Sequence, residues 1–275
     1  MAKSNKIVTF PSTAEEWNRL SVEERFRILF HDFWLDGTDT NCMWYHYTTI
    51  DILLSMISSS GVEFWATQSR FLNDSIEIQV GINKLANILP KNITQKQLEN
   101  RYTCSVFVSC FSLAKDSVPM WNTYAQAGNG IALGFEPHIP STDDYRILKV
   151  IYEGTEDESL WRKQTIRLTE KNGNFGTTQL LSSIVYLPMA LKNNAFEYEH
   201  EIRMVCEKNE INFRSRNGLL IPYKKFTVDI SHLKEIMIGP TADADRQQFA
   251  IELLLRKYNI QGVKITRSAV PLRNG

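Results

Sequence analysis

The sequence predicts an α+β fold whose core is a mostly antiparallel β-sheet. Short segments of strand-like composition alternate irregularly with helical segments, and residues 209–217 have the polar composition of a hairpin tip. The chain lacks the G-x-G-x-x-G and Walker-type glycine loops and the G-x-S-x-G elbow. These absences argue against a Rossmann dehydrogenase, an NTPase and an α/β-hydrolase.

Composition limits the class of protein and of partner. The chain has 275 residues, of which 43% are hydrophobic, so it can bury a substantial core. Lys+Arg and Asp+Glu both number 31, and the resulting net charge of zero argues against a general attraction to nucleic acid or to an anionic membrane. For a macromolecular partner, this balance slightly favours protein over nucleic acid.

The cysteines and the N-terminus indicate a cytoplasmic protein without a metal site. The four cysteines form no C-x-x-C pair, and no histidine cluster completes a zinc pattern. We therefore expect reduced, mostly buried thiols. Residues 1–10 lack the apolar core of a signal peptide, and no apolar run is long enough to span a membrane.

Two capping boxes predict a helical extension at the N-terminus. Residues 12–15 and 21–24 each place a serine three residues before a glutamate, which is the pattern of a helix start. The second helix is expected to run to Phe33, because phenylalanines recur there at helical spacing. We assign residues 1–40 to this extension and residues 41–275 to a single α+β domain.

The remaining elements follow from β-branched and aromatic runs, from helical periodicity and from caps. The predicted strands are residues 43–47, 62–66, 105–112, 131–135, 145–152, 198–205, 219–226, 233–238 and 263–268. The predicted helices are residues 50–59 and 75–89, short helices beginning at 94 and 117, and residues 179–193 and 243–258. Residues 153–176 are charged and poorly periodic, and they predict a helix followed by a loop.

The first candidate site lies on the predicted strand 198–205. Because side chains alternate along a strand, Glu199, Glu201 and Arg203 are expected to share one face. Two carboxylates in this spacing can orient a ribose hydroxyl and align a nucleophile, which is the E-x-E arrangement of ADP-ribosyl transfer. A solvated sheet face explains the same alternation, and spacing alone favours that explanation.

Three further groups are candidates for ligand binding. His46 is expected at a strand end before a capped helix, beside Tyr45, Tyr47 and Thr48, where exposed amides favour an anion. A histidine that is simply hydrogen-bonded in the core is the alternative.

Ser112, at the end of a predicted strand, can position a catalytic carboxylate, and Trp121, with Tyr124 after it, can wall a nicotinamide pocket. A serine that marks a strand end, followed by core aromatics, is the alternative that this stretch alone favours. Arg70 can hold a pyrophosphate, with Asn73 beside it, although Asn73 is equally suited to capping the next helix.

Read in order, these segments resemble the uncharacterised bacterial family called "domain of unknown function 2971". The segments that carry the resemblance are Tyr45-His-Tyr-Thr48, Phe71-Leu-Asn-Asp74, Ser109-Cys-Phe-Ser112, Met120-Trp121 with Tyr124, Gly130-Ile-Ala-Leu-Gly-Phe135, Tyr198-Glu-His-Glu201-Ile-Arg203 and Ile236-Met-Ile-Gly239. In motif order, this family is similar to the ADP-ribosyltransferase fold, which has a split, mostly antiparallel sheet with flanking helices.

The resemblance implies an NAD-dependent ADP-ribosyltransferase or NAD glycohydrolase, and a toxin-type effector in anti-phage defence is one such role. It implies that Glu201 is the catalytic glutamate, that Glu199 is the first glutamate of E-x-E, and that His46 contacts the nicotinamide-side ribose. NAD is then a substrate, and no metal is needed. The residues expected to bind NAD are Tyr45, Tyr47, Thr48, Arg70, Asn73, Ser112, Trp121, Tyr124 and Arg203.

Arg203 departs from the transferase pattern, and pairing with Glu201 would suppress the chemistry. The alternative function is therefore a non-catalytic module on the same fold, which senses a nucleotide or binds a partner protein.

Overall fold

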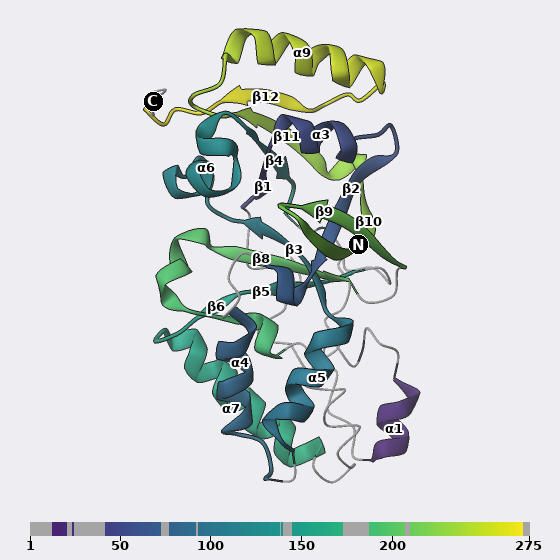
Figure 1. Ribbon diagram of the computed structural model, residues 1–275, viewed down its shortest axis with the longest axis vertical. Helices are drawn as coiled ribbons and strands as arrows, with labels where there is room; N and C mark the ends of the chain where they lie inside the picture. Colours follow the sequence, from purple (N-terminus) through teal and green to yellow (C-terminus); the bar gives the residue numbers. More distant parts are fainter. Residues whose placement is uncertain are drawn as a thin grey trace, which may run out of the picture. The chain divides into compact units, whose positions relative to one another are not determined.

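The computed structural model describes residues 13–20, 24, 42–72, 77–91, 93–137, 139, 145–172, 187–206 and 210–271. The fold is mixed α+β with a mostly antiparallel sheet and several helices, as the sequence predicts (Figure 1). The chain forms two compact units, one from Met1–Trp34, Asn73–Cys104 and Lys149–Asn194 and the other from Leu35–Leu72, Ser105–Leu148 and Ala195–Gly275. The predicted boundary near residue 40 stays a prediction.

The second unit contains the main sheet. Its strands follow the order β12-β11-β4-β1-β3-β2-β10-β9, and β8 pairs with both β3 and β5. All pairings along that path are antiparallel except the parallel pairing of β11 with β12. The strands are β1 (Trp44–Thr48), β2 (Gly61–Gln68), β3 (Phe107–Ser112), β4 (Ile131–Phe135), β5 (Tyr145–Lys149), β8 (Glu201–Cys206), β9 (Ile211–Arg216), β10 (Leu219–Asp229), β11 (Leu233–Ile238) and β12 (Lys264–Arg267).

Short helices flank this sheet. They are α3 (Ile50–Met56), α6 (Val118–Tyr124) and α9 (Ala244–Lys257), with 3₁₀ turns η1 (Ser69–Phe71), η2 (Gln126–Gly128), η5 (Asn194–Glu199) and η6 (Ile230–His232). Figure 1 shows α9 running along β12 and α6 beside β1. The caps are local: the Thr49 side chain accepts from the amide of Ile52, and Asp243 accepts from that of Arg246.

An aromatic core covers one face of the main sheet. Phe64 lies at its centre, with ring centroids 5.0 Å from Phe111, 5.7 Å from Phe135 and 5.4 Å from Phe226. Trp44 is fully buried in the same cluster. These contacts explain why the aromatic strand segments of the sequence become the central strands β1, β2 and β3.

The first unit is built from helices and a small sheet. Its elements are α1 (Ala14–Arg19), α4 (Glu77–Ala86), α5 (Gln95–Ser105), α7 (Glu156–Asn172), η4 (Leu187–Ala190), and the parallel strands β6 (Ile151–Tyr152) and β7 (Leu191–Lys192). Trp161 of α7 is buried and donates its ring N–H to the carbonyl of Leu187 at 3.1 Å. A side chain at Gly81 of α4 would meet the backbone of Pro188 at 2.4 Å, so this close contact requires glycine.

Several predicted elements are corrected by the structure. The described part of the predicted helix 179–193 is η4 and β7 instead, because Pro188 lacks the amide that a helix interior needs and β7 pairs with β6. The predicted strand 145–152 divides into β5 and β6, which belong to different sheets.

Helix boundaries shift as well. Thr13, rather than Ser12, caps α1, and α3 ends at Met56, so Gly61 opens β2 and does not stop the helix. The predicted second N-terminal helix lies outside the described residues apart from Glu24.

Two glycines of the family-like motifs lie against each other where β4 and β11 meet. The amide of Gly239 donates to the carbonyl of Gly130 at 3.0 Å. A Cβ atom on Gly239 would lie 2.1 Å from the carbonyl oxygen of Gly128, and one on Gly130 would lie 2.2 Å from that of Thr48. Backbone proximity therefore explains both glycines without any role in ligand binding.

None of the helices in the described ranges is both long enough and apolar enough to cross a membrane.

The aromatic core yields a stability prediction. Phe64→Ala removes a ring that is 1% exposed, and we expect a loss of about 3–5 kcal/mol in the free energy of unfolding. Phe249→Ala on α9 is the matched control, since this ring is 63% exposed and its loss should change the free energy by less than about 0.5 kcal/mol. Urea denaturation followed by fluorescence measures both, and equal effects would contradict the assignment of Phe64 to the core.

Candidate functional site

The strand register determines which predicted site residues share a face of the main sheet. Tyr45 of β1 pairs with Ser112 of β3, and Ser112 pairs with Glu201 of β8. Directly paired residues of antiparallel strands project to the same side, so these three side chains belong to one face. His46, which follows Tyr45 on β1, projects to the opposite face.

Glu201 and Arg203 form a buried ion pair on β8. The Arg203 Nε lies 2.8 Å from Glu201 Oε1 and the second nitrogen Nη2 lies 3.0 Å from Oε2, which is a bidentate arrangement. The Arg203 side chain is 0% exposed and the Glu201 side chain is 3% exposed. The expected shared face is therefore correct for these two residues, and the face is buried rather than solvated.

Glu199 reaches the same cluster from a different element. The prediction that it lies on the strand is wrong, since β8 begins at Glu201 and Glu199 ends the 3₁₀ turn η5. His200 between them has a positive φ of 42°, which interrupts the alternation of a strand. Glu199 is nevertheless buried, and its carboxylate accepts a hydrogen bond from the Tyr124 hydroxyl at 2.8 Å.

Ser112 joins these residues through the backbone. Its hydroxyl donates to the carbonyl of Glu199 and accepts from the amide of Ala114 at 2.9 Å. The structure thus brings together five of the predicted residues, which we call the Glu201 cluster: Ser112, Tyr124, Glu199, Glu201 and Arg203. Ser112 has no exposed surface, so the hydroxyl serves to fix η5 against β3.

His46 is not part of the Glu201 cluster. Its ring packs against Phe64 and Phe111, with centroids 5.1 and 5.4 Å away, and its Nδ1 lies 3.0 Å from the carbonyl oxygen of Cys110. Burial lowers the pKa of His46 below its ordinary value, while the hydrogen bond to Cys110 opposes this shift. His46 is therefore a hydrogen-bonded histidine of the core, which was the alternative to a ligand-binding role.

The predicted aromatic ligands pack against each other. Tyr47 and Trp121 meet edge to face at 4.9 Å, and the Trp121 ring N–H donates to Asp116 at 2.8 Å. The Tyr47 hydroxyl donates to the carbonyl of Ala114 at 2.7 Å, and burial raises its pKa to about 12. Both rings thus belong to a small core cluster between β1 and α6.

Three other predicted residues lie elsewhere. Thr48 is buried at the end of β1. Arg70 is exposed on η1. Asn73 lies outside the described residues.

A second polar cluster was missed by the sequence reasoning. Glu235 of β11 is 5% exposed, and it accepts hydrogen bonds from Tyr45 at 3.0 Å, from Thr266 at 2.7 Å and from Lys115 at 3.1 Å. We call these four residues the Glu235 cluster. The available signal was the single carboxylate of strand 233–238, whose other residues except Lys234 are apolar, since a buried strand keeps a charge only where partners surround it.

Burial alone raises the pKa of Glu235, but the hydrogen bonds from Thr266, Lys115 and Tyr45 together lower it below the ordinary value. Burial also raises the pKa of Tyr45, and its hydrogen bond to Glu235 adds to the effect. The Glu235 cluster therefore holds its buried carboxylate ionised and hydrogen-bonded. Among the residues that the structure describes, no group of three or more His, Cys, Asp or Glu side chains is placed to hold a metal ion.

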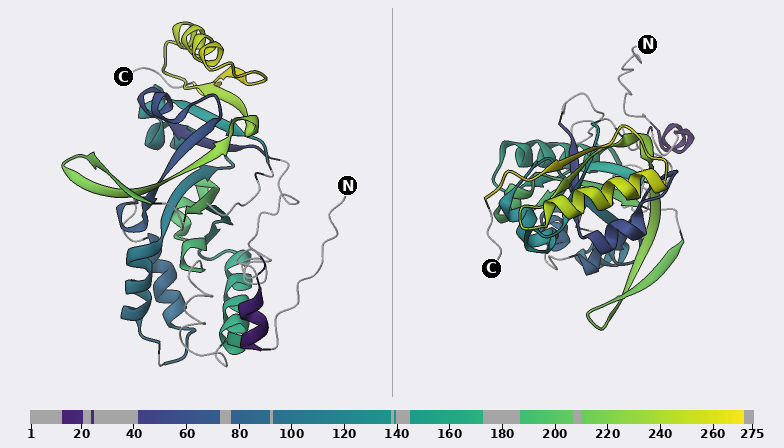
Figure 2. Two further views of the ribbon diagram at one scale, coloured as in Figure 1. Left: turned by 90° about the vertical axis from the view of Figure 1, so that its right-hand side faces the viewer. Right: turned by 90° about the horizontal axis from the view of Figure 1, so that it is seen from above.

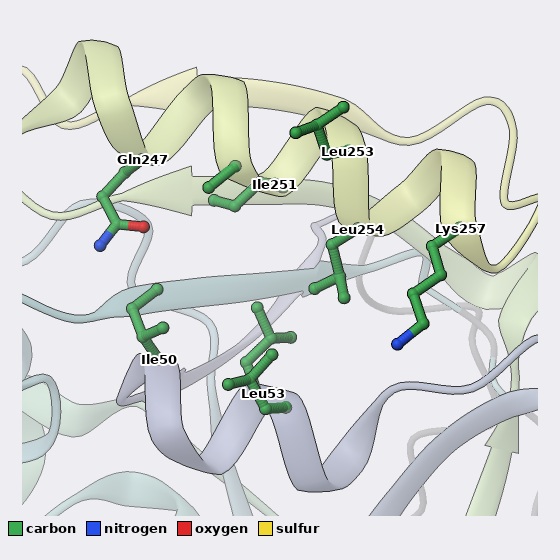
Figure 3. A pocket seen from close by; sticks show the side chains of 9 residues that line it. Ile50, Leu53, Gln247, Ile251, Leu253, Leu254 and Lys257 are labelled. Atoms are coloured by element: carbon green, nitrogen blue, oxygen red, sulfur yellow. The ribbon is translucent and has the colours of Figure 1, made fainter.

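An apolar groove of about 270 Å³ lies between α3 and α9 (Figure 3). Figure 3 shows Ile50 and Leu53 of α3 facing Ile251 and Leu254 of α9 across it. Leu54 and Leu253 at its margin are 58% and 47% exposed. Apart from Gln247 and Lys257 the lining is apolar, and a groove of this composition suits an apolar partner.

Comparison with known proteins confirms the predicted family resemblance over part of the chain. The family model described as "Protein of unknown function (DUF2971)" matches residues 120–204, which include Trp121, Tyr124, Glu199, Glu201 and Arg203. No curated protein and no solved structure matches the chain.

The Glu201–Arg203 pair is testable by a double-mutant cycle. Arg203→Met leaves the Glu201 carboxylate buried without its bidentate partner, and we expect a loss of about 3–5 kcal/mol in the free energy of unfolding. Adding Glu201→Leu removes both charges and should restore most of this loss. The control is Arg19→Met, which breaks an exposed pair with Glu15 and should cost less than about 1 kcal/mol. Equal losses in the single and double variants would contradict a coupled pair.

The Glu235 cluster predicts a pH dependence. Because the pKa of Glu235 is lowered from 4.5 by folding, the unfolded chain binds the proton more tightly. Its contribution to stability is therefore present above about pH 4.5 and is lost as the pH falls through the folded-state pKa. Glu235→Gln should make the decline in stability from pH 6 to pH 3 shallower than in the parent, as measured by urea denaturation. Glu210→Gln, which changes an exposed carboxylate, should keep the parental slope.

Proposed function

We propose that this protein is a non-catalytic interaction module that binds a partner protein. The observation that carries this proposal is the buried, bidentate pairing of Glu201 with Arg203. A catalytic glutamate of ADP-ribosyl transfer has to present its carboxylate to a ribose hydroxyl and to a developing positive charge. Here Arg203 occupies both carboxylate oxygens, and the side chain is 3% exposed.

The position of His46 supports the same proposal. The transferase pattern needs the histidine and the glutamate to converge on one ligand, yet His46 and Glu201 project to opposite faces of the sheet. A ligand on one face of a sheet cannot contact a side chain buried in the core of the other face. The tyrosines and the tryptophan that were expected to bind NAD are engaged in core packing.

Exposed apolar surface provides the positive support for binding a protein. The α3–α9 groove and the large apolar side chains at its margin remain open to solvent. Contiguous apolar surface of this kind marks interaction sites in soluble proteins.

An NAD-dependent ADP-ribosyltransferase or glycohydrolase is the second candidate. One observation favours it: Ser112 and Glu201, which the resemblance assigns to one NAD site, are direct neighbours on adjacent strands and share a face. This candidate includes four proposals: a sheet of the ADP-ribosyltransferase-like type, NAD as substrate, a cytoplasmic location and a toxin-type role in defence against phage.

An NAD assay separates the two candidates. The full chain is incubated with nicotinamide-labelled and adenine-labelled NAD, with and without cell lysate. We expect no release of nicotinamide and no labelled acceptor above a buffer control, because Glu201 is not available. Release or transfer that Glu201→Gln abolishes and the exposed control Glu210→Gln retains would establish the enzyme. Saturable NAD binding without turnover would replace the protein partner with nucleotide sensing. Circular dichroism establishes that both variants are folded.

A further inference from the structure

The hairpin of β9 and β10 extends beyond the rest of its unit, as both views of Figure 2 show. Asn217 and Gly218 form its tip with positive φ angles of 51° and 77°, as expected of a tight two-residue hairpin turn. Among the described strands, β9 pairs only with β10, so it is the edge of the sheet. Alternate residues of an edge strand turn their N–H and C=O groups outward.

One face of this hairpin carries exposed apolar side chains, with the buried Lys224 opposite Ile211 at its base. Phe213 pairs with Pro222 and Leu220 pairs with Ser215, which places these four side chains with Ile211 on the same side. Ile211, Phe213 and Leu220 are 49%, 60% and 66% exposed. An unprotected edge with this much apolar surface invites pairing with another strand.

The other face is basic and aromatic. The Arg214 guanidinium lies 5.6 Å from the centroid of Trp65 and 5.7 Å from that of Tyr223, which stack on each other at 4.6 Å. Arg216 is exposed on the same side of β9. Within the described residues, neither arginine has a carboxylate within ion-pair distance, and the Arg214 Nε is buried without a hydrogen-bond acceptor.

Burial and then the nearby Arg216 lower the pKa of Arg214. The local field of the two arginines therefore favours an anionic neighbour, although the net charge of the chain is zero.

We propose that β9 binds an extended segment of a partner protein by strand addition, and that apolar residues alternate with acidic residues in this segment. Main-chain hydrogen bonds to the open edge supply the register. The apolar side chains cover Ile211 and Phe213, while the carboxylates on the other side meet Arg214 and Arg216. This inference rests on the proposed interaction function and specifies the chemistry of the partner.

Charge argues against a second copy of the chain as the occupant. A symmetric antiparallel pairing of two β9 strands would keep the arginines of both copies on one face of the combined sheet. Like charges on neighbouring strands destabilise such a pairing, whereas a strand carrying glutamate or aspartate neutralises it.

The test uses the full-length protein and fluorescein-labelled ten-residue peptides in fluorescence anisotropy. The probe alternates valine with glutamate. One control peptide alternates valine with lysine, and a second repeats the probe with N-methyl groups on alternate residues, which remove its strand-pairing amides. We expect saturable binding of the probe, at least about tenfold weaker binding of both control peptides, and weakening by added salt.

Matched variants locate the site. Phe213→Ser should weaken probe binding at least about tenfold, while Phe249→Ser, which changes an equally exposed ring on α9, should leave it unchanged. Arg216→Glu should abolish the preference for the acidic peptide, and Arg246→Glu on α9 is its control.

Equal binding of the N-methylated peptide, equal binding of the lysine peptide, or no binding of the probe would overturn the proposal. A dimer in analytical ultracentrifugation that Phe213→Ser dissociates would overturn it in favour of a second copy. These outcomes are independent of the NAD assay, so failure of strand addition is distinguishable from failure of the interaction function.

Discussion

The buried pair of Glu201 and Arg203 is the constraint on which the rest of the site depends. Moving a carboxylate and a guanidinium out of water costs several kcal/mol per ion, and only bidentate geometry with further hydrogen bonds offsets that cost. The pair has the bidentate geometry, and beside it η5 folds back so that Glu199 is held by Tyr124 and Ser112. Residues that resemble catalytic machinery thus fix the start of β8 against β3.

The two faces of the main sheet explain why the family-like motifs converge only in part. The motif around His46 contributes its tyrosines to one face and the histidine to the other. When both faces of a strand are buried, packing alone selects several large side chains in a row, which then look like a functional motif. The motif glycines Gly130 and Gly239 have an equally structural origin, since neighbouring backbones leave no space for a Cβ atom.

We therefore expect binding where the fold leaves side chains and backbone groups exposed to solvent. The buried clusters around Glu201 and Glu235 have satisfied hydrogen bonds, whereas the α3–α9 groove and the β9 edge offer apolar side chains to solvent. The edge combines open backbone groups with an apolar face and with Arg214 and Arg216, and these features together specify an extended, acidic partner. A net charge of zero conceals this local asymmetry.

The sequence by itself determined the α+β class, the strands β1, β3, β4 and β11, and helix α9, because their periodicity and caps are local properties. It also indicated that Arg203 would compete for Glu201, since residues two apart on a strand share a face. Only the tertiary structure decided that this face is buried, that Glu199 approaches it from a 3₁₀ turn, and that Glu235 is a buried anchor. These outcomes depend on which strands become neighbours, and local periodicity carries no information about that choice.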